Sequence, residues 1–319
     1  MWFARTSRES SPRSRTEPSQ EPAVAGLRLD SGVYRQLDRL QLTASRFLRG
    51  RGVGSRASFR RKPAIEFREH RKYVPGDDLR FIDWKASARH EHYFLRQGEQ
   101  PKEASIYLVI DCSGSMRWGH PPKSRAQLLL AAALGYVALS QGDRLTVLPV
   151  GGDPWQNPWG PISGKGQVPG LLHFLFGLEF ASQVPLEQAI LQALQPVSPP
   201  GLVLILSDLM GVSHLSDLLA RLPAPTWDVV VIHMLHPSEI VPTQHGNWEL
   251  VDIETGSSAN YDIDSDAVAR YAARIAAWKS AMELECVEHR ALYISCTSDE
   301  RLEPDLLGHL RALDILRPT

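Results

Sequence analysis

After residue 101, short aliphatic runs alternate with longer stretches of helical periodicity, and this alternation limits the folds that the chain can adopt. The aliphatic runs lie at residues 106–111, 145–150, 202–206, 229–235 and 292–295. The helical stretches lie at residues 125–139, 168–178, 186–194, 215–222, 267–288 and 302–316. Short and uniformly apolar runs are typical of parallel strands covered on both faces, and strands joined by helices imply right-handed crossovers. We therefore predict an α/β fold with a doubly wound, mostly parallel sheet.

The part of the chain before this region divides in two. Residues 1–26 are rich in Ser, Arg, Pro and Glu. Such a segment buries too little apolar surface to offset the entropy of ordering, so we predict a disordered tail. Residues 27–100 are predicted to form an N-terminal accessory region, and residues 101–319 to form the α/β domain.

The charge, the cysteines and the hydropathy of the sequence limit the classes of protein to which the chain can belong. The 35 basic and 36 acidic side chains give a formal net charge of −1, which argues against a dedicated nucleic-acid-binding protein. The three cysteines (Cys112, Cys286 and Cys296) are scattered, as is typical of reduced thiols in the cytosol. The longest apolar run, residues 128–139, is too short to span a bilayer, and the N-terminus lacks a signal-peptide pattern. We expect a cytoplasmic protein with no membrane span.

A loop that combines a carboxylate with two hydroxyls follows the first predicted strand. Asp111 ends this strand, and Ser113 and Ser115 follow at alternate positions. Asp208 stands in the same way just after the run at 202–206. In a doubly wound sheet, ligands bind at the carboxyl ends of the strands where the strand order reverses, so we expect the two aspartates to meet there. Because such oxygens suit Mg²⁺ or Mn²⁺, we predict a metal site formed by Asp111, Ser113, Ser115 and Asp208.

This pattern, Asp-x-Ser-x-Ser at 111–115 followed by Asp208, resembles the metal-ion-dependent adhesion site of von Willebrand factor type A domains. The resemblance implies that two hydroxyls bind Mg²⁺ directly, that the aspartates hold its waters, and that an acidic side chain of a partner protein fills the open position. Those domains also use a threonine from a later loop. Residues 151–170 contain none, and Ser163 is the nearest hydroxyl, so the shell is either incomplete or completed by water. The structural alternative is that these side chains only satisfy backbone groups in a turn.

A second motif, "YVPGDDLRFIDWKASAR", spans residues 73–89. It resembles the signature of domain-of-unknown-function family fifty-eight (DUF58), in which it precedes a von Willebrand type A-like domain. The resemblance implies work with a MoxR-type AAA+ ATPase, so that the partner is the ATPase or its client. The motif and its flanks predict a network of charged and aromatic side chains: Arg68, Arg71, Asp77, Asp78, Arg80, Asp83, Trp84 and Arg89. Such a network either clamps the accessory region to the α/β domain or binds a partner.

Together these features predict a protein-interaction module that is not an enzyme. Trp155 and Trp159 lie in a loop rich in Pro and Gly and are candidate partner-binding residues, unless they pack beneath that loop. The rival function is a metal-dependent phosphoester hydrolase at the same crevice, in which the metal and the carboxylates activate water. Arg117 is the only nearby arginine that could clamp a phosphate. A third alternative is a scaffold surface that binds no metal.

Overall fold

The computed structural model describes residues 2–6, 31–42, 67–72, 84–87, 93–98, 103–152, 157–181, 186–194, 199–243, 245–252, 258–299, 305, 307–312 and 315–318. The chain divides into two compact units. The larger comprises Met1–Val53 and Ala104–Pro318, and the smaller comprises Gly54–Glu103. The predicted boundaries near residues 26 and 100 stay predictions.

A six-stranded sheet, in the order β12-β9-β8-β5-β6-β7, forms the centre of the larger unit. Its strands are β5 (Ser105–Asp111), β6 (Arg144–Val150), β7 (Trp159–Ile162), β8 (Leu202–Ser207), β9 (Asp228–Leu235) and β12 (Leu292–Thr297). All neighbours are parallel except β7, which runs antiparallel to β6. Every residue of β5, β8 and β9 is buried, as expected for strands covered on both faces. The predicted α/β fold with a mostly parallel sheet is confirmed.

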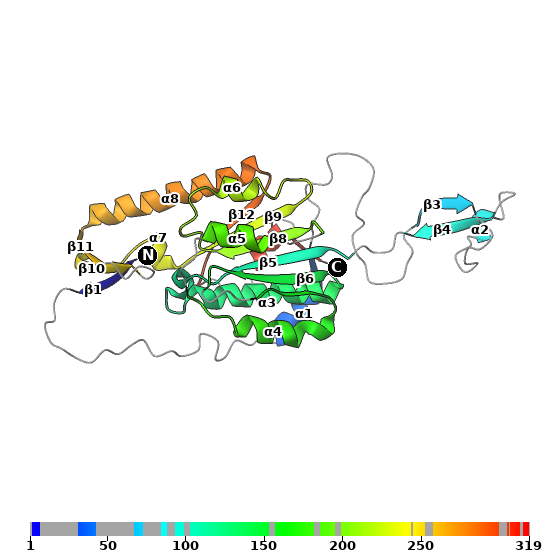
Figure 1. Ribbon diagram of the computed structural model, residues 1–319, viewed down its shortest axis with the longest axis horizontal. Helices are drawn as coiled ribbons and strands as arrows, with labels where there is room; N and C mark the ends of the chain where they lie inside the picture. Colours follow the sequence, from blue (N-terminus) through cyan, green and yellow to red (C-terminus); the bar gives the residue numbers. More distant parts are fainter. Residues whose placement is uncertain are drawn as a thin grey trace. The chain divides into compact units, whose positions relative to one another are not determined.

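Helices cover both faces of this sheet (Figure 1). On one face lie α1 (Ser31–Leu37), α3 (Lys123–Gln141) and α4 (Val168–Phe176); on the other lie α5 (Leu186–Leu194), α6 (Leu215–Leu219) and α8 (Ser265–Glu288). Successive strand residues point to opposite faces, so Leu108 joins the first apolar layer and Val109 the second. Between β5 and β8 the strand order reverses, which is where an open α/β sheet opens a crevice.

Short elements complete the larger unit. A separate antiparallel sheet contains β1 (Trp2–Thr6), β10 (Gly246–Asp252) and β11 (Ser258–Ile263). β2 (Leu40–Leu42) pairs with β13 (Leu316–Pro318) beside α9 (Leu307–Ala312). The short helices are η3 (Gly114–Arg117), η4 (Lys165–Gln167) and α7 (Pro237–Ile240). The strand β1 lies within residues 1–26, the segment predicted to be disordered. The other residues of that segment lie outside the described ranges.

The smaller unit contains β3 (Phe67–Lys72), α2 (Trp84–Ser87) and β4 (Phe94–Gly98), and its two strands pair antiparallel. Of the predicted charged network, Arg68 and Arg71 lie on β3. Trp84 begins α2, is 64% exposed, and meets the ring of Tyr93 edge to face. The other members lie outside the described residues: Asp77, Asp78, Arg80, Asp83 and Arg89. The network therefore stays a prediction.

Candidate functional site

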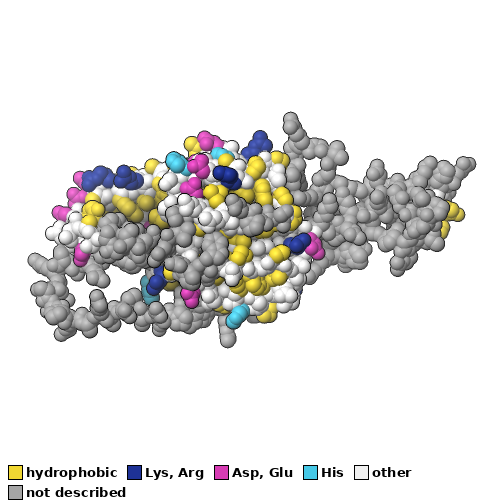
Figure 2. Space-filling model, in the orientation of Figure 1, with side chains coloured by type: hydrophobic (Ala, Val, Ile, Leu, Met, Phe, Trp, Pro, Cys, Tyr) yellow, Lys and Arg dark blue, Asp and Glu magenta, His cyan; other side chains and the backbone are white. Residues whose placement is uncertain are grey.

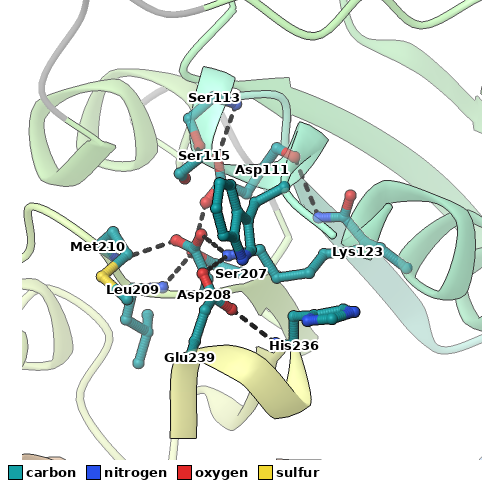
Figure 3. Close-up of polar contacts among 12 residues, drawn as sticks. Asp111, Ser113, Ser115, Lys123, Ser207, Asp208, Leu209, Met210, His236 and Glu239 are labelled. Atoms are coloured by element: carbon teal, nitrogen blue, oxygen red, sulfur yellow. Dashed lines mark hydrogen bonds and ion pairs between the residues drawn. The ribbon is translucent and has the colours of Figure 1, made fainter. Parts of the chain in front are cut away.

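Asp111 and Asp208 lie at the same edge of the sheet because β5 and β8 are neighbouring parallel strands. Asp111 is the last residue of β5, and Asp208 follows the last residue of β8. Ile110 pairs in register with Leu206, which places the two strand ends side by side. Figure 3 shows both aspartates within one cluster of polar side chains, and both are fully buried. The structure thus brings the two predicted carboxylates together at the reversal of strand order.

The Asp111 carboxylate accepts hydrogen bonds from neutral groups only, among the contacts of the described residues. The backbone N–H of Ser113 donates to Oδ1 at 2.9 Å, and the Ser207 hydroxyl donates to Oδ2 at 2.5 Å. Burial, and then the negative charge of Asp208, raises the pKa of Asp111 to about 7, although these hydrogen bonds act in the opposite direction. A nearby cation would favour the ionised form of Asp111.

The two serines of the Asp-x-Ser-x-Ser loop face each other across a short gap. Their Oγ atoms are 2.9 Å apart and both side chains are buried, with Ser115 held in η3. At this distance the two hydroxyls form a hydrogen bond. Two adjacent oxygens of an octahedral Mg²⁺ shell, each roughly 2.0–2.1 Å from the ion, would also stand about 2.9 Å apart. The hydroxyls therefore have the spacing that two neighbouring metal ligands need.

The loop after β8 is folded tightly around Asp208. The Ser207 hydroxyl accepts from the Leu209 N–H at 2.8 Å, and Asp208 Oδ1 accepts from the Met210 N–H at 2.9 Å. Leu209 has a φ of 54°, a left-handed conformation that its β-carbon disfavours. Such backbone strain persists only where the surrounding contacts fix it. The loop thus holds the Asp208 carboxylate in one position.

Lys123 reaches Asp208 from the first turn of α3, a contact that was not predicted from the sequence. Its Nζ lies 2.5 Å from Asp208 Oδ2 and 2.7 Å from Glu239 Oε1, and all three side chains are buried. Burial acts to lower the pKa of Lys123, but the two carboxylates more than offset this, so its pKa is raised and the ammonium stays charged. Figure 3 shows the three charged groups converging beside Asp111.

Glu239 comes from α7, the short helix that follows β9. Its Oε2 accepts from the His236 N–H at 2.6 Å, as part of a capping box that starts the helix. The indole N–H of Trp118 donates to the Ser238 hydroxyl at 3.3 Å, which links α7 to the loop after η3. The site is therefore built from the loops after three adjacent strands: β5, β8 and β9.

One sequence signal could have pointed to Lys123. A lysine in the first turn of a helix opposes the helix dipole, which favours acidic groups there. A fully buried lysine at such a position needs carboxylate partners. Its partners, however, lie 85 and 116 residues further along the chain, so their identity comes from the tertiary structure.

Ser163 does not lie at this edge of the sheet. It follows β7, and β7 runs antiparallel, so that Ile162 pairs with Leu145 near the start of β6. Ser163 is thus at the amino ends of the parallel strands, opposite Asp111. The segment after α4 approaches the site instead, because the N–H of Ala181 donates to the Cys112 carbonyl at 3.0 Å.

The two candidate tryptophans have different outcomes. Trp159 begins β7, is partly buried, and stacks on the ring of Phe174 in α4 at 5.9 Å between centroids. Trp155 lies outside the described residues. A partner-binding role for either residue stays a prediction.

The oxygens gathered here suit a hard divalent cation. Ser113 and Ser115 could bind Mg²⁺ or Mn²⁺ directly, and Asp111 and Asp208 could hold its water ligands. Among the described residues, no group of three or more His, Cys, Asp and Glu side chains is arranged to hold a metal ion. A metal at this position would therefore depend on the serine hydroxyls and on water for most of its shell.

The surface charges and the helices of the described residues concern the predictions about nucleic-acid binding and membrane spans. On the face shown in Figure 2, Lys and Arg side chains are interspersed with Asp and Glu. None of the described helices combines the length and the apolar character needed to cross a membrane. The predictions about nucleic acid and cellular location stay open.

Comparison with known proteins shows relatives in mycobacteria. Proteins of Mycobacterium bovis and of two Mycobacterium tuberculosis strains, each described as an uncharacterized protein, are 30% identical to the chain over 262 residues. The match covers 76% of this chain and 79% of each relative.

Among solved structures, the chain resembles the conserved hypothetical protein BatB from Bacteroides thetaiotaomicron, with 12% identity and a TM-score of 0.42. It also resembles an aerotolerance-related membrane protein from Bacteroides fragilis, with 11% identity and a TM-score of 0.39. Each alignment covers 66% of this chain and 98% of the other.

The family described as "Protein of unknown function DUF58" matches residues 69–281, more than half of the sequence, and the chain therefore belongs to the DUF58 family.

Proposed function

We propose that the chain is a protein-interaction module whose larger unit is a von Willebrand type A-like domain. Its crevice at the ends of β5 and β8 binds Mg²⁺, with Mn²⁺ as a substitute, and the bound ion captures an acidic side chain of a partner protein. The module has no catalytic role in this proposal.

One observation carries the proposal: two carboxylates and two hydroxyls from distant parts of the sequence meet at the reversal of strand order. Asp111 has neutral hydrogen-bond donors and a raised pKa, so a divalent ion would favour its charged form. The spacing of the serine hydroxyls matches adjacent positions of an octahedral shell. A turn that only satisfied its own backbone would not require the second carboxylate.

In the proposed interaction, this chain supplies the residues that hold the ion, and the partner supplies a carboxylate. Ser113 and Ser115 would position the ion, and Asp111 and Asp208 would orient its waters. When bound, the ion supplies a positive charge with an open coordination position. A carboxylate is a hard oxygen ligand, so an aspartate or glutamate of the partner fits that position.

The partner that we propose is a MoxR-type AAA+ ATPase or a client of that ATPase. This assignment rests on the family resemblance of the motif at residues 73–89, and membership of the DUF58 family supports the resemblance. An ATPase that remodels clients would benefit from an adaptor that binds reversibly through a metal.

The test is capture of the MoxR-type ATPase of the same organism by the immobilised full-length chain, in Mg²⁺ and in EDTA. Capture should occur in Mg²⁺ and be lost in EDTA. It should also be lost in Asp111→Ala with Asp208→Ala and in Ser113→Ala with Ser115→Ala. The matched control, Ser258→Ala with Ser265→Ala, removes two exposed hydroxyls and should capture normally.

Equal capture of the ATPase in Mg²⁺ and in EDTA would disprove the proposal. Hydrolysis of generic phosphoesters by the wild type, lost in Asp208→Ala, would instead favour the hydrolase alternative. Circular dichroism and thermal unfolding should accompany each variant, so that lost capture is separated from lost folding.

A further inference from the structure

Lys123 places a permanent positive charge inside the candidate metal site. The lysine is 0% exposed, and its Nζ bridges Asp208 Oδ2 at 2.5 Å and Glu239 Oε1 at 2.7 Å. Both contacts are charge-assisted hydrogen bonds of the strong class. Because Asp208 is itself fully buried, its negative charge is balanced within the protein, whether or not a metal is present.

The two aspartates of the site therefore differ. Asp208 has an ammonium bound to one oxygen and the Met210 N–H bound to the other. Asp111 accepts hydrogen bonds from the Ser113 N–H and the Ser207 hydroxyl, both of which are neutral. A divalent ion entering between them would find one carboxylate already paired with a cation and one that accepts hydrogen bonds from these neutral groups.

Lys123 and an incoming metal ion would also repel each other, because both would lie close to the same Asp208 carboxylate. The energy between charges a few ångströms apart in a buried setting is large compared with thermal energy. Glu239 reduces the conflict, since it gives Lys123 a second carboxylate partner, apart from Asp208. The lysine thus remains paired in both states.

We propose that Lys123 is the internal counter-ion of Asp208 and that it lowers the affinity of the site for divalent cations. In the metal-free protein it replaces the missing metal charge, so the crevice stays folded when empty. In the metal-bound protein Lys123 still neutralises part of the negative charge of Asp208. The site then neutralises less of the ion's positive charge, so the ion attracts a carboxylate of the partner more strongly. The proposal deepens the proposed function and rests on it for the identity of the cation, but Lys123 has its own measurable effect.

The experiment measures thermal unfolding of the full-length chain in EDTA and in saturating Mg²⁺, together with calorimetric titration of Mg²⁺. Lys123→Met should bind Mg²⁺ at least about tenfold more tightly than the wild type, because the competing charge is gone. Its Mg²⁺-induced rise in Tm should exceed that of the wild type by about 3 °C. Lys123→Met is expected to be the less stable protein in EDTA, since two buried carboxylates lose their cationic partner.

Two further variants make the result interpretable. Lys123→Met with Glu239→Gln removes the ammonium together with one carboxylate, so it folds with only Asp208 unpaired and should show the same gain in Mg²⁺ response. The matched control is Lys165→Met, which removes a lysine ion pair of similar length, 2.7 Å to Asp38, at an exposed position. Its Mg²⁺ affinity and its Mg²⁺-induced change in Tm should equal those of the wild type.

Each outcome separates this inference from the proposed function. If the wild type and Lys123→Met both bind Mg²⁺ with equal affinity, the inference is wrong and the metal site stands. If neither protein binds Mg²⁺, the inference and the proposed function are both wrong. If only the lysine variants bind Mg²⁺, the inference holds and the proposed function fails in its present form. If both lysine variants stay unfolded at every Mg²⁺ concentration, a metal cannot replace the ammonium, and the inference is overturned.

Discussion

His233 shows, at the scale of one residue, how burial controls charge beside the site. It lies on β9 in register with Ser207, and its Nδ1 is 2.6 Å from the Tyr293 hydroxyl. The ring packs edge to face on Trp278 with centroids 4.8 Å apart. Burial lowers the pKa of His233 to about 4, and the nearby Asp208 only partly counters this effect. The histidine is therefore neutral at physiological pH.

This shift predicts a loss of stability in mild acid. The unfolded chain takes up a proton near pH 6.5 and the folded protein only near pH 4, so stability falls as the pH decreases between these values. The contribution of His233 amounts to about 3 kcal/mol when the transition is complete. Urea unfolding at pH 7.5 and pH 4.5 should show that His233→Gln loses less stability than the wild type on acidification. Equal losses in both proteins would contradict this account.

At the scale of elements, the central sheet depends on a close approach between β5 and the start of β8. A β-carbon on Gly201 would lie 2.0 Å from the Ser105 carbonyl oxygen. Because the obstacle is backbone, Gly201→Ala should destabilise the fold by about 1–3 kcal/mol through overpacking. Gly166→Ala is the matched control, because a β-carbon there meets no atom within 4 Å. Denaturant midpoints that shift equally for both variants would disprove the close-approach argument.

The elements also show which features could be predicted from the sequence. The strands that end at Asp111 and Ser207 were readable because strands buried on both faces are uniformly apolar, and the meeting of the aspartates then follows from the topology. The position of Ser163, the hydroxyl nearest in sequence to the missing threonine, could not be predicted, because a short antiparallel strand, β7, reverses the chain before it. Lys123 and Glu239 were missed because their pairing spans distant segments and has no periodic signature.

At the scale of the whole molecule, the larger unit is assembled from two separated stretches of chain. Leu37 of α1 and Leu40 of β2 are buried in its core, and β2 pairs with β13 near the C-terminus. The Tyr136 hydroxyl donates to Asp38 at 2.7 Å, and the Gln141 amide donates to the Leu40 carbonyl at 2.9 Å. Residues 31–42 are thus part of the same core as the candidate site.

This assembly predicts different results for two deletions. Replacing residues 54–103 by a flexible Gly/Ser linker should leave the larger unit folded with unchanged Mg²⁺ affinity, because those residues form a separate compact unit. A chain that begins at Ala104 lacks α1 and β2, and it should unfold at a lower urea concentration. Loss of Mg²⁺ binding in the linker variant, or equal stability of the shortened chain, would show that the units are divided wrongly.

In the proposed site, Asp111, Ser113, Ser115 and Asp208 share one divalent cation. Calorimetric titration of Mg²⁺ into the full-length wild type and into Asp111→Ala with Asp208→Ala tests this sharing. We expect a single saturable site in the wild type and no binding heat in the double variant. Binding of Mg²⁺ with equal affinity in both proteins, or no binding in either, would contradict it.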